Sequence, residues 1–277
     1  MHSARPIRNV VLYVALVAIA GMFALPLIWM VAVSLTPPTE LATVTFLPQH
    51  PQFDAYGDVL HSESFDFLLY ARNTLILVVL SLFGTLACSS IAAYGFSRIS
   101  FPGRDLLFGV CLATMMIPFP VVMVPQYMLF KQIGWIGTTL PLWVPASFGH
   151  AFNIFLLRQF FMGIPRDLEE SAMIDGCSRW ACFVKIILPL ATPALTVVAL
   201  FHTLAIWNDL VAPLIYLVHK EQFTLSLGLQ FLQSRSGNTP WNQMMAAATL
   251  IVLPVLVLFV IAQRAFIRGI ATTGLKE

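Results

Sequence analysis

Few side chains in this sequence are charged, and the acidic residues within or beside its apolar runs are the first candidates for chemistry. Asp209 follows Trp207 and Asn208 inside a long apolar run. If this run crosses a membrane, the buried charge costs about 2.5 kcal/mol or more, so Asp209 should face a partner group or a wet cavity. With Asn153 in another apolar run, these residues are candidates for a polar path or gate. A contact that only holds helices together is the alternative interpretation.

A second acidic group lies in the segment Gly163–Ile186, between two apolar runs. Glu169 and Glu170 fall near the N-terminal end of a predicted short helix, where the helix dipole favours negative charge. Gly176 is placed to end that helix, and Ser178 is placed to cap a second one. Two short amphipathic helices between apolar runs indicate a docking element for a soluble partner. An ordinary surface charge and an ordinary helix stop are the alternative.

The sequence lacks the common motifs for catalysis and for ATP binding. It contains no HExxH or GxSxG motif and no pair of aspartates in separate apolar runs, so we expect no enzyme active site. It also contains no GxxxxGK[ST], so a P-loop is not expected. Cys88, Cys111, Cys177 and Cys182 form no CxxC pair or metal-ligand spacing, which predicts free thiols and no metal site. The net charge of +2 is too small to suggest a nucleic-acid partner.

The composition is that of an integral membrane protein. Of the 277 residues, 58% are hydrophobic and only 10% are charged, and the mean hydropathy is +0.84. Water-soluble domains carry about a quarter charged residues. Because backbone groups in lipid must bond internally and about 20 residues cross the hydrocarbon as a helix, we expect an all-α protein with six transmembrane helices. The six apolar stretches are Val10–Val33, Thr74–Phe96, Leu106–Phe130, Thr138–Leu157, Ile187–Val218 and Met244–Ala262.

Proline content and charge refine this topology. Three prolines, among them Pro118, predict a break in the third stretch. The fifth stretch is too long to be one straight span. With the N-terminus in the cytosol, 11 of the 15 lysines and arginines lie on the cytosolic side, and the positive-inside rule therefore places both termini there. One acid within a span and no visible repeat argue against an ion-coupled secondary transporter.

The segment between the fourth and fifth stretches also resembles a known family motif. Glu170-Ser-Ala172, three residues, Gly176, nine residues and Ile186-Ile-Leu-Pro189 resemble the EAA loop of ABC importer permeases, E-A-A-x3-G-x9-I-x-L-P. Ser171 is the one departure, and Asp175 matches the usual Asp-Gly pair. The segments NTL, AAYGFSRISFPGR and WND also resemble the sugar-uptake branch. The maltose-type second permease is the most similar type, and the glycerol-phosphate type is the alternative.

The resemblance implies a type I ABC importer permease fold with cytosolic coupling helices, in a bacterial plasma or inner membrane. Its implied partners are a second permease, two ATPase subunits that bind ATP and Mg²⁺, and an extracytoplasmic sugar-binding protein. This chain would itself hold no cofactor. The residues implied in ATPase coupling are Glu169, Glu170, Ala172, Asp175 and Gly176. The WND segment would then line the sugar path or pack the permease core.

The domain organisation that we expect has three parts. Residues 1–70 form the first transmembrane helix and an extracytoplasmic loop. Residues 71–264 form the transmembrane core, with the EAA loop at 163–189, and residues 265–277 form a cytosolic tail.

Overall fold

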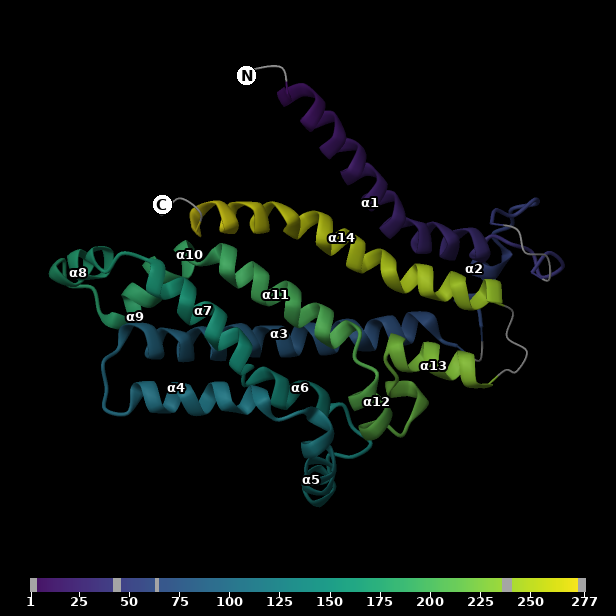
Figure 1. The fold of residues 1–277 in the computed structure, drawn as a ribbon. Helices are drawn as coiled ribbons and strands as arrows, with labels where there is room; N and C mark the ends of the chain where they lie inside the picture. The colour runs from purple at the N-terminus through teal and green to yellow at the C-terminus, as the bar shows by residue number, and fades with distance from the viewer. Residues whose placement is uncertain (1–3, 42–45, 63–64, 236–240, 274–277) are drawn as a thin grey trace. The chain divides into compact units, whose positions relative to one another are not determined.

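A computed structural model describes residues 4–41, 46–62, 65–235 and 241–273, which are helical with no strand among them (Figure 1). The chain divides into two compact units. The first contains residues up to Leu68 together with Gly228–Pro254, and the second contains Leu69–Leu227 together with the residues from Val255 onward.

The first unit is built on α1 (Ala4–Ser34) and the first part of α14 (Trp241–Thr273). The described part of the loop after α1 is ordered and contains α2 (Asp54–Leu60). The Ser34 and Tyr56 hydroxyls lie 2.6 Å apart and join the end of α1 to α2. Within the loop, His50 Nδ1 lies 2.8 Å from Glu40 Oε1, and this hydrogen bond holds the pKa of Glu40 below its usual value.

The second unit begins with the long helix α3 (Phe67–Arg98) and a broken third span. α4 (Arg104–Ala113) and the 3-10 turn η1 (Thr114–Met116) are followed by α5 (Phe119–Gln132), which is bent by 96° from them. The break falls at Pro118, whose ring fixes the backbone and removes a hydrogen-bond donor, so the prediction is confirmed. The fourth span consists of α6 (Leu140–Ser147) and α7 (Ala151–Gly163).

The rest of the second unit holds the segment between the fourth and fifth spans and the fifth span itself. Its elements are α8 (Asp167–Ile174), α9 (Arg179–Cys182), the π-helical turn η2 (Phe183–Ile187), α10 (Leu188–Leu190), α11 (Thr192–Trp207), α12 (Val211–Tyr216), η3 (Lys220–Gln222) and the start of α13 (Leu225–Arg235). The chain bends by 75° between the segment Arg179–Leu190 and α11. The fifth stretch is therefore not straight, as expected, and its longest helix, α11, ends at Trp207 rather than at Val218.

Four described segments are long and apolar enough to cross a membrane, and the number rises to six where each of the two bent helix pairs is counted as one span. Two boundaries differ from the sequence prediction. α3 begins at Phe67 rather than at Thr74, and α14 continues past Ala262 to Thr273, so that much of the expected tail is a continuation of the last helix. Apolar length marks only the part of a helix in lipid, because the backbone bonds continue equally well in water. Residues 274–277 lie outside the described residues.

The core of the second unit joins α3, α7 and the segment from α9 to α11. α7 packs against α4 and α11. Ala93, Leu157, Phe161, Ile187 and Val198 are almost fully buried in this core. The helices α8 and α9 lie at the end of the unit where α3 finishes, as Figure 1 shows.

Candidate functional site

The helices α8 and α9 form a hairpin whose turn is built by local sequence. The positive φ of 87° at Gly176 favours glycine, because a Cβ would be strained there. Its N–H donates to the Met173 carbonyl at 3.1 Å, and the Cys177 N–H donates to the Ala172 carbonyl at 2.9 Å. This pair of bonds is a Schellman motif, which satisfies carbonyls at the end of α8. The prediction that Gly176 ends the first short helix is confirmed.

The start of the second helix of the hairpin also follows the sequence prediction. Ser178 has extended backbone angles, and its Oγ accepts a hydrogen bond from the Ala181 N–H at 3.2 Å. α9 passes directly into the π-helical turn, from which Phe183 and Ile187 are buried in the core. The hairpin is therefore continuous with the packed part of the unit on its α9 side.

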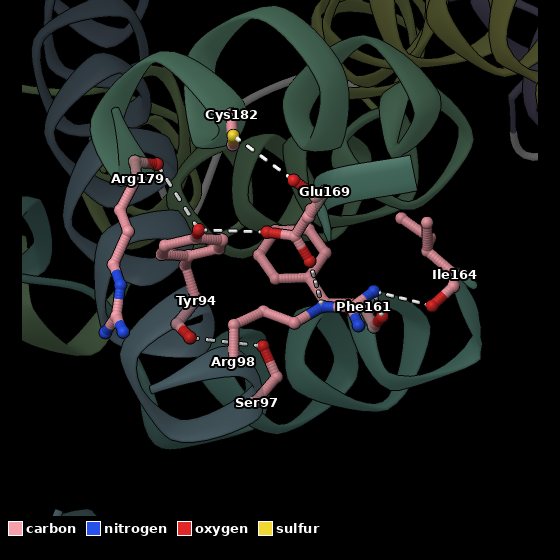
Figure 2. Close-up of polar contacts among 8 residues, drawn as sticks. All are labelled: Tyr94, Ser97, Arg98, Phe161, Ile164, Glu169, Arg179 and Cys182. Atoms are coloured by element: carbon pink, nitrogen blue, oxygen red, sulfur yellow. Dashed lines mark hydrogen bonds and ion pairs between the residues drawn. The ribbon is translucent and has the colours of Figure 1, made fainter. Parts of the chain in front are cut away.

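The two adjacent glutamates of α8 face in different directions. Glu169 is buried, and its Oε2 lies 3.0 Å from Arg98 Nε at the end of α3 (Figure 2). The two side chains are only 8% and 5% exposed. The Tyr94 hydroxyl donates to Glu169 Oε1 at 2.9 Å, and the Arg179 carbonyl lies at 3.3 Å as a second acceptor. Glu170 is exposed. Both glutamates were predicted coupling residues, and the sequence alone does not say which of them is buried.

Arg98 also binds the end of α7. Its Nη2 donates to the carbonyl oxygens of Phe161 and Ile164, both at 2.6 Å (Figure 2). These carbonyls lie at a helix end, where no intrahelical donor is available. The guanidinium of Arg98 therefore joins three segments: its own helix α3, the end of α7 and, through Glu169, α8.

A second arginine makes the reciprocal contact from α7. Arg158 Nε donates to the Phe96 carbonyl near the end of α3 at 3.3 Å, and its guanidinium lies 4.1 Å from the centroid of the Phe108 ring on α4. α3 and α7 thus each supply an arginine to the other's final carbonyls. In the sequence, Arg98 and Arg158 contribute only to the excess of positive charge on the expected cytosolic side. The segment AAYGFSR contains both Tyr94 and Arg98, and its resemblance to the family pattern is the signal in the sequence that points to them.

The exposed surface of the hairpin carries several large apolar side chains. Ile174, next to the turn, is 87% exposed, and Trp180 is 62% exposed. Leu168 and Met173 are also exposed. Of the residues singled out from the sequence, Glu170, Asp175 and Gly176 are exposed and Ala172 is partly buried. We call Leu168, Glu170, Met173, Ile174 and Trp180 the hairpin surface. Several exposed large apolar side chains on one short hairpin, with a charged neighbour, are typical of a protein-binding surface.

Asp209 lies at a break between helices and not in the middle of one. α11 ends at Trp207, which is buried, and the exposed Asn208 donates from its amide to the Leu204 carbonyl at 2.8 Å. Asp209 Oδ1 accepts a hydrogen bond from the Ala212 N–H in the first turn of α12 at 3.3 Å. The carboxylate therefore satisfies a free backbone donor, as a capping residue does. Asn153 is buried in α7.

We expect the Asp209→Ala variant to lose about 0.5–2 kcal/mol of stability, because the N–H at the start of α12 loses its acceptor. The Asp209→Asn variant keeps an acceptor and should match the wild type in stability, whereas its transport should fall if the carboxylate also lines the polar path. Thermal unfolding of the purified assembly and uptake into liposomes measure the two effects. Unchanged stability in Asp209→Ala would contradict the capping role, and unchanged transport in Asp209→Asn would remove Asp209 from the candidate polar path.

The NTL segment closes the opposite end of α3. The Asn73 amide donates to the carbonyls of Glu221 at 2.8 Å and Phe223 at 3.1 Å. Thr74 Oγ1 accepts a hydrogen bond from the Leu225 N–H at 2.9 Å. These bonds satisfy the backbone after η3, so Asn73 and Thr74 fix the start of α13 against α3.

Several membrane-length helices, two bent helix pairs and a short helical hairpin define this chain as a multi-pass membrane protein. Its fold matches a crystal structure of a bacterial ABC transporter involved in the import of the acidic polysaccharide alginate, with a TM-score of 0.82 at 23% identity, over 95% of this chain and 98% of that chain. A second structure, of a bacterial alginate ABC transporter in complex with an alginate pentasaccharide-bound periplasmic protein, matches with a TM-score of 0.68 at 18% identity, over 95% and 96% of the two chains.

Residues 69–272 match the family described as the binding-protein-dependent transport system inner membrane component, and the chain belongs to that family. The arabinooligosaccharides transport system permease protein AraQ of Halalkalibacterium halodurans is 30% identical, over 98% of each chain. The galactooligosaccharides transport system permease protein GanQ of Bacillus subtilis is 31% identical, over 100% of this chain and 98% of the relative. The trehalose/maltose transport system permease protein MalG of Thermococcus litoralis is 28% identical, over 98% of each.

Proposed function

We propose that this chain is the permease subunit of an ATP-driven sugar importer and that it couples to the ATPase through the hairpin surface. The observation that carries the proposal is the exposure of Ile174 and Glu170 beside the turn at Gly176. A large aliphatic side chain that is 87% exposed outside the apolar spans is costly in water unless a partner covers it. An acidic neighbour adds charge recognition to that contact.

The ATPase is a separate partner in this proposal. The sequence holds no P-loop, so ATP and Mg²⁺ would be bound by two ATPase subunits, each contacting the hairpin of one permease. Closure of the ATPases on ATP would displace the hairpin, and the displacement would switch the spans between outward and inward access. A second permease would complete the translocation path, to which Asn153, Trp207, Asn208 and Asp209 of this chain are the candidate contributions.

The charge distribution supports a cytosolic position for the hairpin. Arg98, Arg158, Arg166 and Arg179 all lie on or beside the hairpin, at the end of α3. Arginine-rich ends of membrane helices face the cytosol in most membrane proteins. With six spans, both chain termini would lie on the same side as the hairpin.

A neutral oligosaccharide is the substrate class that we favour. Three of the relatives compared above carry the names of arabinooligosaccharide, galactooligosaccharide and trehalose/maltose systems. The external binding protein would deliver the sugar, as the structure with a pentasaccharide-bound periplasmic protein supports. Glycerol phosphate or a polyol is the alternative substrate.

The experiment is purification of the tagged chain from its native membrane, identification of its companions, and uptake into liposomes. We expect an ATPase and a second permease to co-purify, and uptake to require ATP and the binding protein. The panel should contain arabino- and galactooligosaccharides, trehalose, maltose and glycerol phosphate. ATP-dependent uptake of glycerol phosphate alone would replace the sugar assignment, and uptake by the lone chain without ATP would overturn the proposal.

A further inference from the structure

The helix α8, all of whose residues the structure describes, has a single buried side chain, that of Glu169. The apolar side chains Leu168, Met173 and Ile174 are exposed, so packing in the core does not hold α8 in place. The buried contacts of this helix run through the Glu169 carboxylate and through the Glu169 carbonyl, which lies 3.9 Å from Cys182 Sγ. The attachment of α8 to the rest of the unit therefore depends mainly on Glu169.

The groups that receive the Glu169 carboxylate are themselves fixed. Tyr94 packs against Phe183 in the core, with ring centroids 4.8 Å apart. Arg98 is held by the two carbonyls at the end of α7, and α7 is held to α3 by the reciprocal contact of Arg158. The carboxylate thus joins α8 to a preformed frame made of the ends of α3 and α7, as Figure 2 shows.

Stability alone is a poor explanation for this arrangement. A buried ion pair contributes little net stability, because desolvation of both charges offsets their attraction. A pair with fixed donors and acceptors does, however, specify one relative position of the elements that carry it. We propose that Glu169 is a positioning residue: its contacts with Arg98 and Tyr94 make the hairpin and the ends of α3 and α7 move as one body.

The inference rests on the proposed ATPase coupling and assigns different roles to the two neighbouring glutamates. Glu170 faces the partner, whereas Glu169 passes the displacement of the hairpin to α3 and α7. The bend between α10 and α11 lies beyond this body, at Ala191. Loss of the Glu169 contact should therefore leave the attachment of the ATPase unchanged. It should weaken the response of ATP hydrolysis to the loaded binding protein.

The test uses the Glu169→Gln variant in the assembled importer. Glutamine keeps the shape of the side chain and an acceptor for Tyr94 but removes the charge that pairs with Arg98. We expect the ATPase to co-purify as in the wild type, and the stimulation of ATP hydrolysis by the loaded binding protein to fall about fivefold or more. Tyr94→Phe, which removes one hydroxyl, should act in the same direction with a smaller effect and provides a second variant if Glu169→Gln does not fold.

A distance measurement reports the positioning directly. Spin labels at Asp167→Cys on α8 and Ser100→Cys after α3, both exposed positions, are introduced after replacing Cys88, Cys111 and Cys177 by alanine. Cys182 is kept, because it is buried and contacts the Glu169 carbonyl. With Glu169 present, we expect the same label distance in the nucleotide-free and the ATP-bound importer. With Glu169→Gln, the distance should shift or broaden on ATP binding. The matched control is Asp105→Asn, which breaks the exposed Arg104–Asp105 pair and should change neither readout.

The outcomes separate this inference from the proposed function. Unchanged stimulation and an unchanged label distance in Glu169→Gln, with or without a lower melting temperature, would show that the pair only stabilises the fold. Loss of the ATPase from Glu169→Gln would also overturn the inference, because it would place Glu169 in the docking contact. The absence of any ATPase from the wild-type complex would instead overturn the proposed function itself.

Discussion

The Glu170→Lys variant is expected to lose its ATPase subunits while still folding and inserting into the membrane. Glu170 is exposed on α8, and no buried contact of the helix depends on it, so charge reversal should leave the hairpin intact. At the partner's surface, a lysine would face the groups that receive the carboxylate. Loss of one member of a desolvated interfacial charge pair costs about 2 kcal/mol or more, which is roughly a thirtyfold loss of affinity.

Co-purification of the ATPase with the tagged permease, at a series of salt concentrations, measures this effect. Asp105→Lys is the matched control, because it reverses an exposed acidic side chain at the start of α4, outside the hairpin. It should retain the ATPase at wild-type levels. If Glu170→Lys retains the ATPase as well as Asp105→Lys does, the hairpin surface is not the docking contact.

The Gly84→Ala variant should be the most destabilising of the small substitutions considered for the second unit. A Cβ at position 84 on α3 would lie 2.8 Å from the Ser147 Cα on α6 and would also overlap the Ser147 side chain. Next to it, the Thr85 hydroxyl donates to the Ala146 carbonyl and fixes the approach of the two helices. The contact involves backbone, so the helices must separate, which typically costs about 1–3 kcal/mol.

Helix propensity works in the opposite direction and is smaller. Alanine in place of glycine stabilises a helix interior by about 0.5–1 kcal/mol. This gain is smaller than the cost of the clash, so Gly84→Ala should be destabilising overall. Gly95, on the same helix, has nothing within 4 Å of its added Cβ, and Gly95→Ala should be neutral or stabilising. Thermal unfolding of the two variants in detergent decides the matter. Equal melting temperatures would mean that α3 and α6 do not approach as closely as the structure shows.

The sequence by itself determined the features that depend on composition and on neighbours in the chain. Apolar length indicated the membrane spans, and Pro118 marked the break between α4 and α5. Gly176 and Ser178 marked the turn of the hairpin, because a left-handed residue and a capping hydroxyl act within a few residues of their own position. The EAA pattern indicated the family for the same reason, since it is a fixed local spacing.

Helix boundaries were harder to predict from the sequence than the existence of the helices. Hydropathy reports which residues suit lipid, but the backbone of α3 and α14 continues beyond them. The end of α11 at Trp207 was missed because the apolar run continues through Asp209. Only the structure showed that the carboxylate of Asp209 binds a backbone donor of the next helix, which explains an acid in an apolar run.

The tertiary structure decided which of two adjacent glutamates is buried. Successive residues on a helix point about 100° apart, so Glu169 and Glu170 cannot both face the frame, but nothing local says which one does. Tyr94 and Arg98 determine which glutamate is buried. Both are distant from Glu169 in the sequence and become its neighbours only when α3 packs against α7. Burial of an acid requires a fixed partner charge, and that partner exists only in the folded chain.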